Sequence, residues 1–345
     1  MENKFFNNNS SVFIVAELSA NHNGDLQVAL DTIKAAKRAG ADAIKLQTYT
    51  PDTMTIKSSE KDFIINNGSI WDGNTLFDLY KKAYTPWEWH EQLFNCAKNE
   101  DIICFSTPFD KSAVDFLEKI SNPIYKIASF EIRDIELIQY AASMMKPIIL
   151  STGVASREDI ELAIKTCRDV GNNQIALLKC TSSYPTPIDQ SNLLMIKEFE
   201  KRYNVITGLS DHTLGVIAPI VAASFGAKII EKHFILNKKI GGPDASFSLD
   251  ENEFKKMVKS IRDAESSIGK IDFELSEKQK SAKVFSRSLY VIKDIKKGEI
   301  FTKKNIKSIR PGFGIHPKYF IKIIGKKSTQ DINRGSQLKH FHYEK

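Results

Sequence analysis

The sequence predicts an α/β fold in which a (β/α)8 barrel, the TIM-barrel architecture, occupies residues 1–280 and a small, mostly β domain occupies residues 284–345. Two observations support this prediction. About eight short apolar runs alternate with amphipathic helical stretches, and near residue 280 this pattern gives way to short strand-like pieces separated by turns. Eight β-then-α units are the number needed to close such a barrel, which typically takes about 250 residues.

The predicted strands are short and β-rich, and they show little strict alternation of apolar and polar positions. This pattern is typical of parallel strands that are buried on both faces. In chain order the runs are VFIVAE (12–17), DAIKLQT (42–48), IICFST (102–107), IYKIAS (124–129), PIILST (147–152), QIALLKCT (174–181), NVITGLS (204–210) and AKIIEKHF (227–234).

Helical patterns fill the spaces between the strands. The stretch LQVALDTIKAAKRAG ends on Gly40, as helices commonly do. Ser156, followed three residues later by Asp159, is a capping signature for the helix predicted at SREDIELAIKTCRDVG. A doubly wound sheet is the alternative fold, but it would have fewer strands and a Gly-rich first turn, which this sequence lacks.

The segment from Tyr49 to Pro86 is too long for a plain loop between a strand and a helix. Long loops of this kind are usually functional. Trp71, within the segment, is a candidate wall residue of a substrate pocket, whereas Trp87 and Trp89 are expected to pack at a helix start.

The composition is that of a globular protein in a reducing compartment. Lysine and arginine exceed aspartate and glutamate by 49 to 42, a net charge of +7, but no basic block with stacking aromatics occurs, so we expect no nucleic-acid partner. The four cysteines form no C-x-x-C pair, which argues against zinc or redox motifs. Neither a signal peptide nor an apolar run of membrane-spanning length is present, so we expect a cytoplasmic protein without membrane contact.

Polar or titratable residues close nearly every predicted strand, at the end where barrel enzymes place their active sites. Lys45, Lys126 and Lys179 lie within predicted strands, where an ammonium group is costly unless it has a partner. Several lysines and hydroxyls at one barrel mouth would suit a phosphate and a carboxylate. The alternative is that one or two of these lysines form internal ion pairs with nearby acids, namely Glu17, Glu131 or Glu231.

His212 and His233 close the seventh and eighth predicted strands, so they come from neighbouring strand ends. Two histidines near acids form a donor set for a divalent metal, but each could equally be a hydrogen-bonded structural residue. The motifs of P-loop proteins, α/β-hydrolases and zincin metalloproteases are absent. From these residues alone, metal binding and structural roles both stay open.

A series of short motifs resembles the sialic acid (N-acylneuraminate) synthase family over nearly the whole chain. In chain order the motifs are AELSANHNG, KLQTYTPD, STPFD, YKIASFE, STG, KCTSSYPTP, GLSDHTLG, EKHF, PDASFSL and IRPGFG. Within the family the resemblance is closest to the pseudaminic branch, and the neuraminic and legionaminic branches are the alternatives. The resemblance implies a (β/α)8 barrel followed by an antifreeze-like (SAF) domain, in agreement with the change of pattern near residue 280.

The resemblance also implies a reaction, in which phosphoenolpyruvate condenses with an N-acetylated amino sugar to give a nine-carbon 2-keto acid. In the pseudaminic branch that sugar is 2,4-diacetamido-2,4,6-trideoxy-L-altrose. The family uses a divalent cation, commonly Mn²⁺, Mg²⁺ or Co²⁺. It acts as a homodimer in which the small domain of one chain covers the barrel mouth of the other.

The functional residues of the family match positions in this sequence one by one. Glu17 matches an acid proposed as the catalytic base, and His212 and His233 match the metal ligands, so these three are candidate catalytic residues together with Lys126. The positions that match phosphoenolpyruvate contacts are Lys45, Thr107, Lys126, Ser129, Ser151 and Ser210.

Three further positions match residues that the family uses for the acceptor sugar. Tyr184 and Asp244 match positions near the sugar, and Arg310 matches an arginine that the small domain delivers to the partner's site to hold an N-acetyl group. Two functions from other classes remain as alternatives. One is a metal-dependent aldolase that uses free pyruvate, and the other is a non-catalytic barrel carrying an ice- or glycan-binding module.

Overall fold

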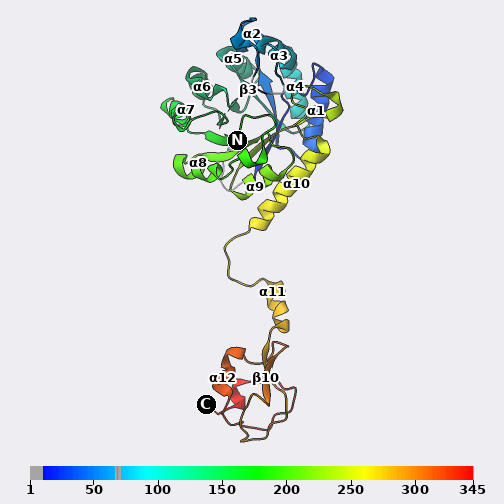
Figure 1. The fold of residues 1–345 in the computed structure, drawn as a ribbon, viewed down its shortest axis with the longest axis vertical. Coiled ribbons are helices and arrows are strands. Elements are labelled where there is room, and N and C mark those ends of the chain that lie inside the picture. The colour runs from blue at the N-terminus through cyan, green and yellow to red at the C-terminus, as the bar shows by residue number, and fades with distance from the viewer. Residues whose placement is uncertain (1–10, 67, 69–70, 345) are drawn as a thin grey trace. The chain divides into compact units, whose positions relative to one another are not determined.

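Eight parallel strands close into a barrel, as predicted (Figure 1). The computed structural model of the chain describes residues 11–66, 68 and 71–344. Each strand pairs with the next one along the chain, and the last pairs with the first. The strands are β1 (Phe13–Glu17), β2 (Ala43–Thr48), β3 (Ile103–Pro108), β4 (Tyr125–Ile127), β5 (Ile148–Ser151), β6 (Ile175–Cys180), β7 (Ile206–Asp211) and β8 (Ile229–His233).

Helices surround the barrel, and their ends follow the predicted capping chemistry. The Ser156 hydroxyl accepts from the Asp159 N–H, and the Asp159 carboxylate accepts from the Ser156 N–H. Gly40 has a φ of +91°, the left-handed conformation that commonly ends a helix. The main helices are α1 (Leu26–Arg38), α4 (His90–Asn99), α5 (Lys111–Lys119), α6 (Ile135–Ser143), α7 (Arg157–Asp169), α8 (Met195–Tyr203), α9 (Ile217–Ser224) and α10 (Glu251–Ile268).

Apolar residues fill both sides of the barrel wall. Inside the barrel, Phe105, Ile149 and Leu178 belong to a cluster of buried side chains contributed by alternate strand positions. Outside it, further clusters pack the strands against the helices. All six residues of β7 are buried, because both faces of the strand are covered. Burial of both faces explains why apolar and polar positions do not alternate along the predicted strands.

The long segment after β2 carries two helices, α2 (Pro51–Met54) and α3 (Leu76–Ala83). Thr50 and Thr75 cap them: the Thr50 hydroxyl oxygen accepts from the Thr53 N–H, and the Thr75 hydroxyl oxygen accepts from the Asp78 N–H. A single 3-10 turn, Trp87–Trp89, then leads into α4, where the Trp87 ring packs 4.7 Å from that of Phe116. The segment therefore folds over one side of the barrel mouth, as its length suggested.

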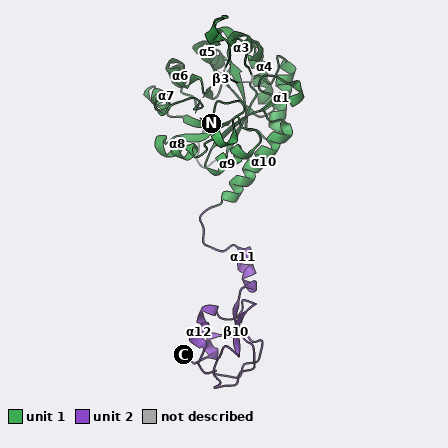
Figure 2. Cartoon of the chain, viewed as in Figure 1, with its two compact units in different colours: residues 1–269 green, residues 270–345 purple. Residues whose placement is uncertain are grey.

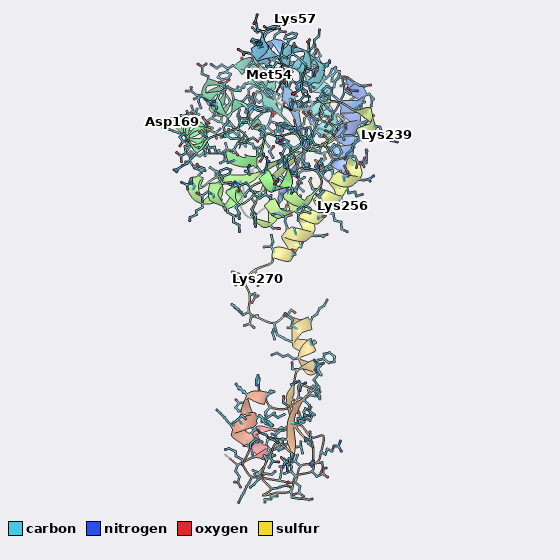
Figure 3. All side chains as sticks on the ribbon, viewed as in Figure 1. Met54, Lys57, Asp169, Lys239, Lys256 and Lys270 are labelled. Atoms are coloured by element: carbon cyan, nitrogen blue, oxygen red, sulfur yellow. The ribbon has the colours of Figure 1, made fainter. Side chains whose placement is uncertain are left out.

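The chain divides into two compact units, residues 1–269 and 270–345 (Figure 2). Lys270, labelled in Figure 3, is the first residue of the second unit. The pattern of the sequence predicts this change near residue 280. In the structure it comes earlier, because α10 ends at Ile268 and α11 (Glu277–Ala282) contacts the 3-10 turn Lys283–Phe285 of the small unit.

The small unit has its own apolar core and a two-stranded antiparallel sheet. The strands are β9 (Ser288–Val291) and β10 (Ile306–Ile309), and a short helix, α12 (Phe320–Ile323), follows them. Leu289, Phe301 and Leu338 are completely buried in this core. Isolated bridges join β9 and the neighbouring turns to residues 327–343, so the unit is mostly β, as predicted.

All four cysteines are free thiols. Within the described part of the chain, no helix is long and apolar enough to cross a bilayer.

Candidate active site

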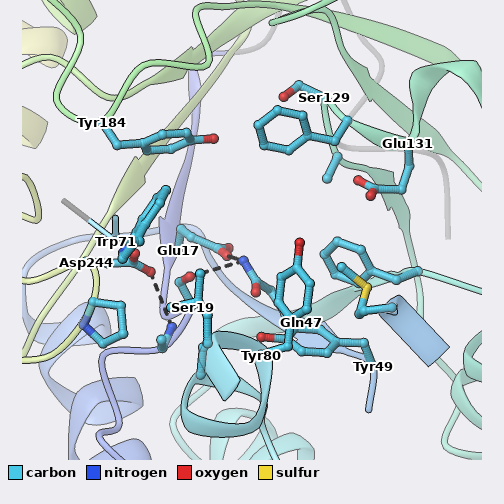
Figure 4. Close-up of a pocket in the computed structure, with 18 of the residues that line it drawn as sticks. Glu17, Ser19, Gln47, Tyr49, Trp71, Tyr80, Ser129, Glu131, Tyr184 and Asp244 are labelled. Atoms are coloured by element: carbon cyan, nitrogen blue, oxygen red, sulfur yellow. Dashed lines mark hydrogen bonds between the residues drawn. The ribbon is translucent and has the colours of Figure 1, made fainter. Parts of the chain in front are cut away.

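A cavity of about 580 Å³ opens at the carboxyl ends of the barrel strands (Figure 4). The segment after β2 forms part of its wall, including Trp71 as predicted. The cavity brings together residues that are far apart in the sequence. The candidate residues that line it are Glu17, Lys45, Lys126, Ser129, Ser151, Tyr184, Ser210, His212, His233 and Asp244.

Strand alternation decides which polar residues reach the cavity. Side chains two positions apart project from the same face of a strand, and Glu231 and His233 both enter the cavity from β8. On β6 it is Cys180 that lines the cavity. Its neighbour Lys179 therefore points outward and donates to the backbone oxygen of Cys180 and, at 2.9 Å, to the hydroxyl of Thr181. Lys179 is thus not part of the group of lysines at the barrel mouth.

A buried ion-pair network lies at the base of the cavity. Lys45 Nζ is 2.6 Å from Glu17 Oε2 and 3.7 Å from Glu231 Oε1, and Lys126 Nζ is 3.2 Å from Glu231 Oε1. All four side chains are at most 6% exposed. The internal ion pairs considered as an alternative are therefore present for two of the three lysines. They do not remove these lysines from the cavity, which Lys45 and Lys126 still line.

The two carboxyl groups of this network have different proton affinities. Burial, with a contribution from the charge of Glu231, raises the pKa of Glu17 to about 7 against the opposing effect of Lys45. Burial also disfavours the charged form of Glu231, but Lys126 and Lys45 outweigh it and lower the pKa of that carboxyl. Glu231 is thus the permanent counter-ion of the lysines, and Glu17 can exchange a proton near neutral pH.

Hydroxyl groups surround the two lysines. Thr107 does not line the cavity itself, but its hydroxyl accepts from Lys45 Nζ at 3.2 Å. The Ser210 hydroxyl donates to Glu231 Oε1 at 3.1 Å. Ser151 Oγ is buried and has no hydrogen-bond partner. A buried hydroxyl without a partner is costly, so this group is available for a ligand.

Gly153, in the loop after β5, packs closely against the loops after β4 and β6. A Cβ at Gly153 would lie 2.1 Å from Ser182 Oγ and 3.0 Å from Cys180 Sγ, so a larger residue there would force these side chains to move. The Ser182 hydroxyl in turn hydrogen-bonds that of Ser129. The loops after β4, β5 and β6 are thereby held together at one side of the cavity.

His212 and His233 face each other at the ends of β7 and β8, with ring centroids 5.3 Å apart. His212 Nδ1 donates to the Thr181 oxygen at 3.1 Å, which leaves its Nε2 as the lone-pair nitrogen. His233 Nδ1 is buried without a hydrogen-bond partner, and its nearest acid is Asp244 Oδ2 at 3.7 Å. Burial and then the charge of His212 lower the pKa of His233 well below its usual value.

These two imidazoles fit a divalent cation, because each presents a nitrogen lone pair and one of them is an orphaned buried atom. Within the described residues, no cluster of three or more His, Cys, Asp or Glu side chains is arranged to hold a metal.

Aromatic rings enclose the cavity on the side of the histidines. The Tyr184 ring lies 4.4 Å from His212 and 5.5 Å from Trp71, and Phe247 lies 4.9 Å from His233. Asp244 Oδ2 accepts from the Ala20 N–H at 3.5 Å, and burial raises the pKa of Asp244.

Comparison with known proteins identifies the family of this chain. A family model described as the NeuB family matches residues 32–272. The chain belongs to the NeuB family. A second model, the SAF domain, matches residues 286–340, which confirms the predicted antifreeze-like domain. Arg310 lies within this SAF match, whereas the cavity lies in the barrel unit.

Individual relatives in the NeuB family span nearly the full chain. Pseudaminic acid synthase from Campylobacter jejuni is 50% identical over 334 residues, which cover 97% of each chain. N,N'-diacetyllegionaminic acid synthase from Legionella pneumophila is 36% identical over 338 residues, covering 96% of this chain and 94% of the relative. Among solved structures, N-acetylneuraminic acid synthetase from Leptospira borgpetersenii is 32% identical with a TM-score of 0.71, covering 80% of this chain and 90% of that one.

Two of the polar residues that close the predicted strands, Glu231 and Gln47, line the cavity of this NeuB chain but were assigned no role in the site from sequence, apart from an ion pair for Glu231. Each lies two residues from a candidate, His233 or Lys45, and so shares its strand face, as the spacing indicated. The Gln47 amide donates to Glu17 Oε1 at 2.9 Å and to Ser19 Oγ at 3.1 Å.

Proposed function

We propose that this chain is a pseudaminic acid synthase. In that reaction phosphoenolpyruvate, 2,4-diacetamido-2,4,6-trideoxy-L-altrose and water give pseudaminic acid and phosphate, so the enzyme is a transferase. The 50% identity to a named pseudaminic acid synthase, against 36% to a legionaminic relative, supports this branch of the family. The observation that carries the proposal is the pair of buried lysines, Lys45 and Lys126, in the same cavity as a pair of histidines.

The base of the cavity would hold phosphoenolpyruvate. Lys45 and Lys126 offer charged donors for its phosphate and carboxylate, and the hydroxyls of Thr107, Ser129, Ser151 and Ser210 surround them. In the free protein Glu17 and Glu231 neutralise the lysines. Because the pKa of Glu17 is about 7, its ionised form is present near neutral pH and can act as a base beside the bound substrate.

His212 and His233 would hold a divalent cation, Mn²⁺, Mg²⁺ or Co²⁺. When bound there, the cation supplies Lewis-acid polarisation of the aldehyde of the open-chain sugar. The chain's own contribution is to orient both imidazoles and to keep that of His233 neutral. The Thr181 oxygen sets the tautomer of His212, and burial favours the neutral form of His233.

The condensation forms one carbon–carbon bond and one carbon–oxygen bond to water, and it breaks the carbon–oxygen bond to phosphate. The methylene carbon of phosphoenolpyruvate attacks the aldehyde carbon, whose oxygen takes up a proton from solvent to become a hydroxyl, and cationic character develops at the adjacent enol carbon. Water adds at that carbon and loses a proton, and the resulting tetrahedral species expels phosphate to leave the 2-keto acid. Lys45 and Lys126 stabilise the leaving phosphate, and Glu17 accepts the proton of the water. Tyr184 and Asp244 would contact the sugar from the histidine side of the cavity.

The proposal includes a cytoplasmic homodimer in which Arg310 of one chain reaches the partner's cavity and holds an N-acetyl group of the sugar. This part is supported by the family resemblance and by the match of the segment around Arg310 to the SAF domain. The four free thiols are consistent with a reducing compartment.

Product analysis tests the proposed reaction. The purified full-length protein is incubated with Mn²⁺, phosphoenolpyruvate and the L-altro acceptor, and the products are identified by mass spectrometry and NMR. We expect equimolar phosphate and a nine-carbon diacetamido 2-keto acid. Condensation with free pyruvate, without phosphate release, would instead identify an aldolase, and a stable folded protein without any turnover would favour a binding module.

A further inference from the structure

The cavity has two sides of different chemistry. The strand ends supply the charged and hydroxyl groups described above. The opposite side, here called the apolar wall, is formed by Tyr49, Leu76, Leu79, Tyr80 and Phe109. The Tyr49 ring makes edge contacts with Tyr80 at 5.8 Å and with Phe109 at 5.1 Å, so the wall is a packed surface. Four of its five residues belong to the long segment between β2 and α4.

Glu131 is a carboxyl group of the cavity that the proposed mechanism does not use. It follows β4 in the 3-10 turn Glu131–Arg133, and its carboxyl is directed into the cavity, on the side opposite Asp244 (Figure 4). Glu131 Oε2 is buried and has no hydrogen-bond partner. Burial raises the pKa of Glu131 to about 7, against the opposing effect of Lys126. A buried polar atom without a partner is a cost that a ligand can remove.

Glu131 also adjoins the apolar wall. Its charge contributes to the raised pKa of Tyr80, although burial of the tyrosine is the larger cause. In a barrel of eight strands, β4 lies opposite β8 and β3 lies opposite β7. Glu131 and Phe109 therefore stand across the cavity from the histidines of β7 and β8. An open-chain sugar with its aldehyde near the histidines would extend its far end toward the wall.

We propose that Glu131 and the apolar wall recognise the far end of the acceptor sugar, with Glu131 hydrogen-bonded to the 4-acetamido group and the wall packed against the 6-methyl group. This inference rests on the proposed function. A carboxyl group can accept from an amide N–H and, when protonated, donate to an amide oxygen, so it complements an acetamido group. The Leu76, Leu79 and Phe109 side chains of the wall pack against a methyl group but offer a hydroxyl no hydrogen-bond partner, which disfavours sugars that keep the 6-hydroxyl.

A pair of matched acceptors tests the role of Glu131. Steady-state phosphate release is measured with the 2,4-diacetamido acceptor and with the same 6-deoxy sugar carrying a hydroxyl at carbon 4. For Glu131→Leu we expect the acceptor KM to rise about tenfold to a hundredfold for the diacetamido sugar and to change less than about threefold for the 4-hydroxy sugar. The KM for phosphoenolpyruvate should stay unchanged.

Two further variants separate recognition from folding. Glu131→Gln keeps one donor and one acceptor, so it should restore most of the affinity lost in Glu131→Leu. Glu136→Leu changes an exposed residue of α6 that pairs only with Lys111 at the surface, and it should behave as wild type. Thermal unfolding of each variant checks that the fold is retained. If Glu131→Leu does not fold, the acceptor KM of Glu131→Gln and the preference of the wild-type enzyme between the two acceptors test the role of Glu131.

The apolar wall makes a separate prediction. Leu79→Asn should lower the preference for a 6-methyl over a 6-hydroxymethyl acceptor by about tenfold while leaving the KM for phosphoenolpyruvate unchanged. Equal losses with both acceptors in either experiment, or a raised KM for phosphoenolpyruvate, would overturn the inference and leave the proposed function intact. Absence of phosphate release by the wild-type enzyme with every acceptor would overturn the proposed function itself, and the inference with it.

Discussion

Lys45 Nζ lies 2.6 Å from Glu17 Oε2 at the base of the cavity, and the two side chains are only 3% and 1% exposed. This pair links the two chemical tasks proposed for the site, because Lys45 is a donor for an anionic substrate and Glu17 is the group proposed to accept a proton. Removing either partner leaves the other charge buried without its nearest counter-charge, and breaking a buried pair typically costs about 3–5 kcal/mol.

Lys45→Met should weaken phosphoenolpyruvate binding strongly. The substitution removes a charged donor and leaves the Glu17 carboxyl without its cation, so the pKa of Glu17 should rise further. We expect kcat/KM for phosphoenolpyruvate to fall by roughly a hundredfold or more. Lys111→Met, which breaks an exposed ion pair with Glu136, is the matched control. An unchanged KM for phosphoenolpyruvate in Lys45→Met would remove this lysine from the substrate site.

Activity should depend on pH through Glu17. Its pKa is raised from 4.5 to about 7, so the ionised form required of a base appears only as the pH rises through about 7. We expect kcat/KM to rise with pH on this limb. Glu131 has a similar pKa, so the profile should also be measured in Glu131→Gln. A profile that is flat between pH 6 and 8 in both proteins contradicts a proton-accepting role for Glu17.

The raised pKa of Glu17 also makes the stability of the fold depend on pH. The folded-state pKa of Glu17 lies above its usual value, so the folded state binds the proton more tightly than the unfolded state does. The contribution of Glu17 to the free energy of unfolding is therefore fully present below about pH 4.5 and is lost as the pH rises through about 7.

His233→Ala should abolish metal-dependent turnover and leave the barrel folded. Isothermal titration with Mn²⁺ should show loss of binding, and circular dichroism should remain that of wild type. His340→Ala, an exposed histidine of the small unit that contacts Tyr343, is the control. Full activity of His233→Ala in the presence of a chelator would refute the metal assignment.

Asp211 belongs to the structure of the barrel. Its carboxylate pairs with Lys232 between β7 and β8, and Lys232 also donates to the Thr213 oxygen. Both side chains are at most 2% exposed. Asp211→Ala should therefore lower the free energy of unfolding by about 3–5 kcal/mol, measured by urea denaturation. A loss of less than about 1 kcal/mol would show that the buried pair contributes little.

The barrel could be predicted from sequence because parallel strands buried on both faces leave apolar runs with clear ends. The polar residues at the strand ends also predicted the location of the site, because a barrel brings the carboxyl ends of all eight strands together at one mouth. Which face each polar residue occupies was harder to predict. Lys179 and Thr181 do share a face, as their spacing of two requires, but that face points away from the cavity. Period-2 spacing groups residues on a strand without saying which group points inward.

Glu131 shows a second limit of sequence reasoning. From its place in the sequence it is expected only as a partner for a lysine. In the structure it has left β4, which ends at Ile127, and its carboxyl enters the cavity without an ion pair. The position of Glu131 depends on the geometry of the turn after β4. It also depends on the apolar wall beside it, which is formed mainly by residues far away in the sequence.

Acceptor competition tests the central claim most directly. Phosphate release from phosphoenolpyruvate is measured with three purified sugars: 2,4-diacetamido-2,4,6-trideoxy-L-altrose, its manno-configured 2,4-diacetamido counterpart and N-acetylmannosamine. A pseudaminic acid synthase should show a kcat/KM for the L-altro sugar at least about a hundredfold above the other two. A higher kcat/KM for either manno-configured sugar would contradict the assignment and place the chain in another branch of the family.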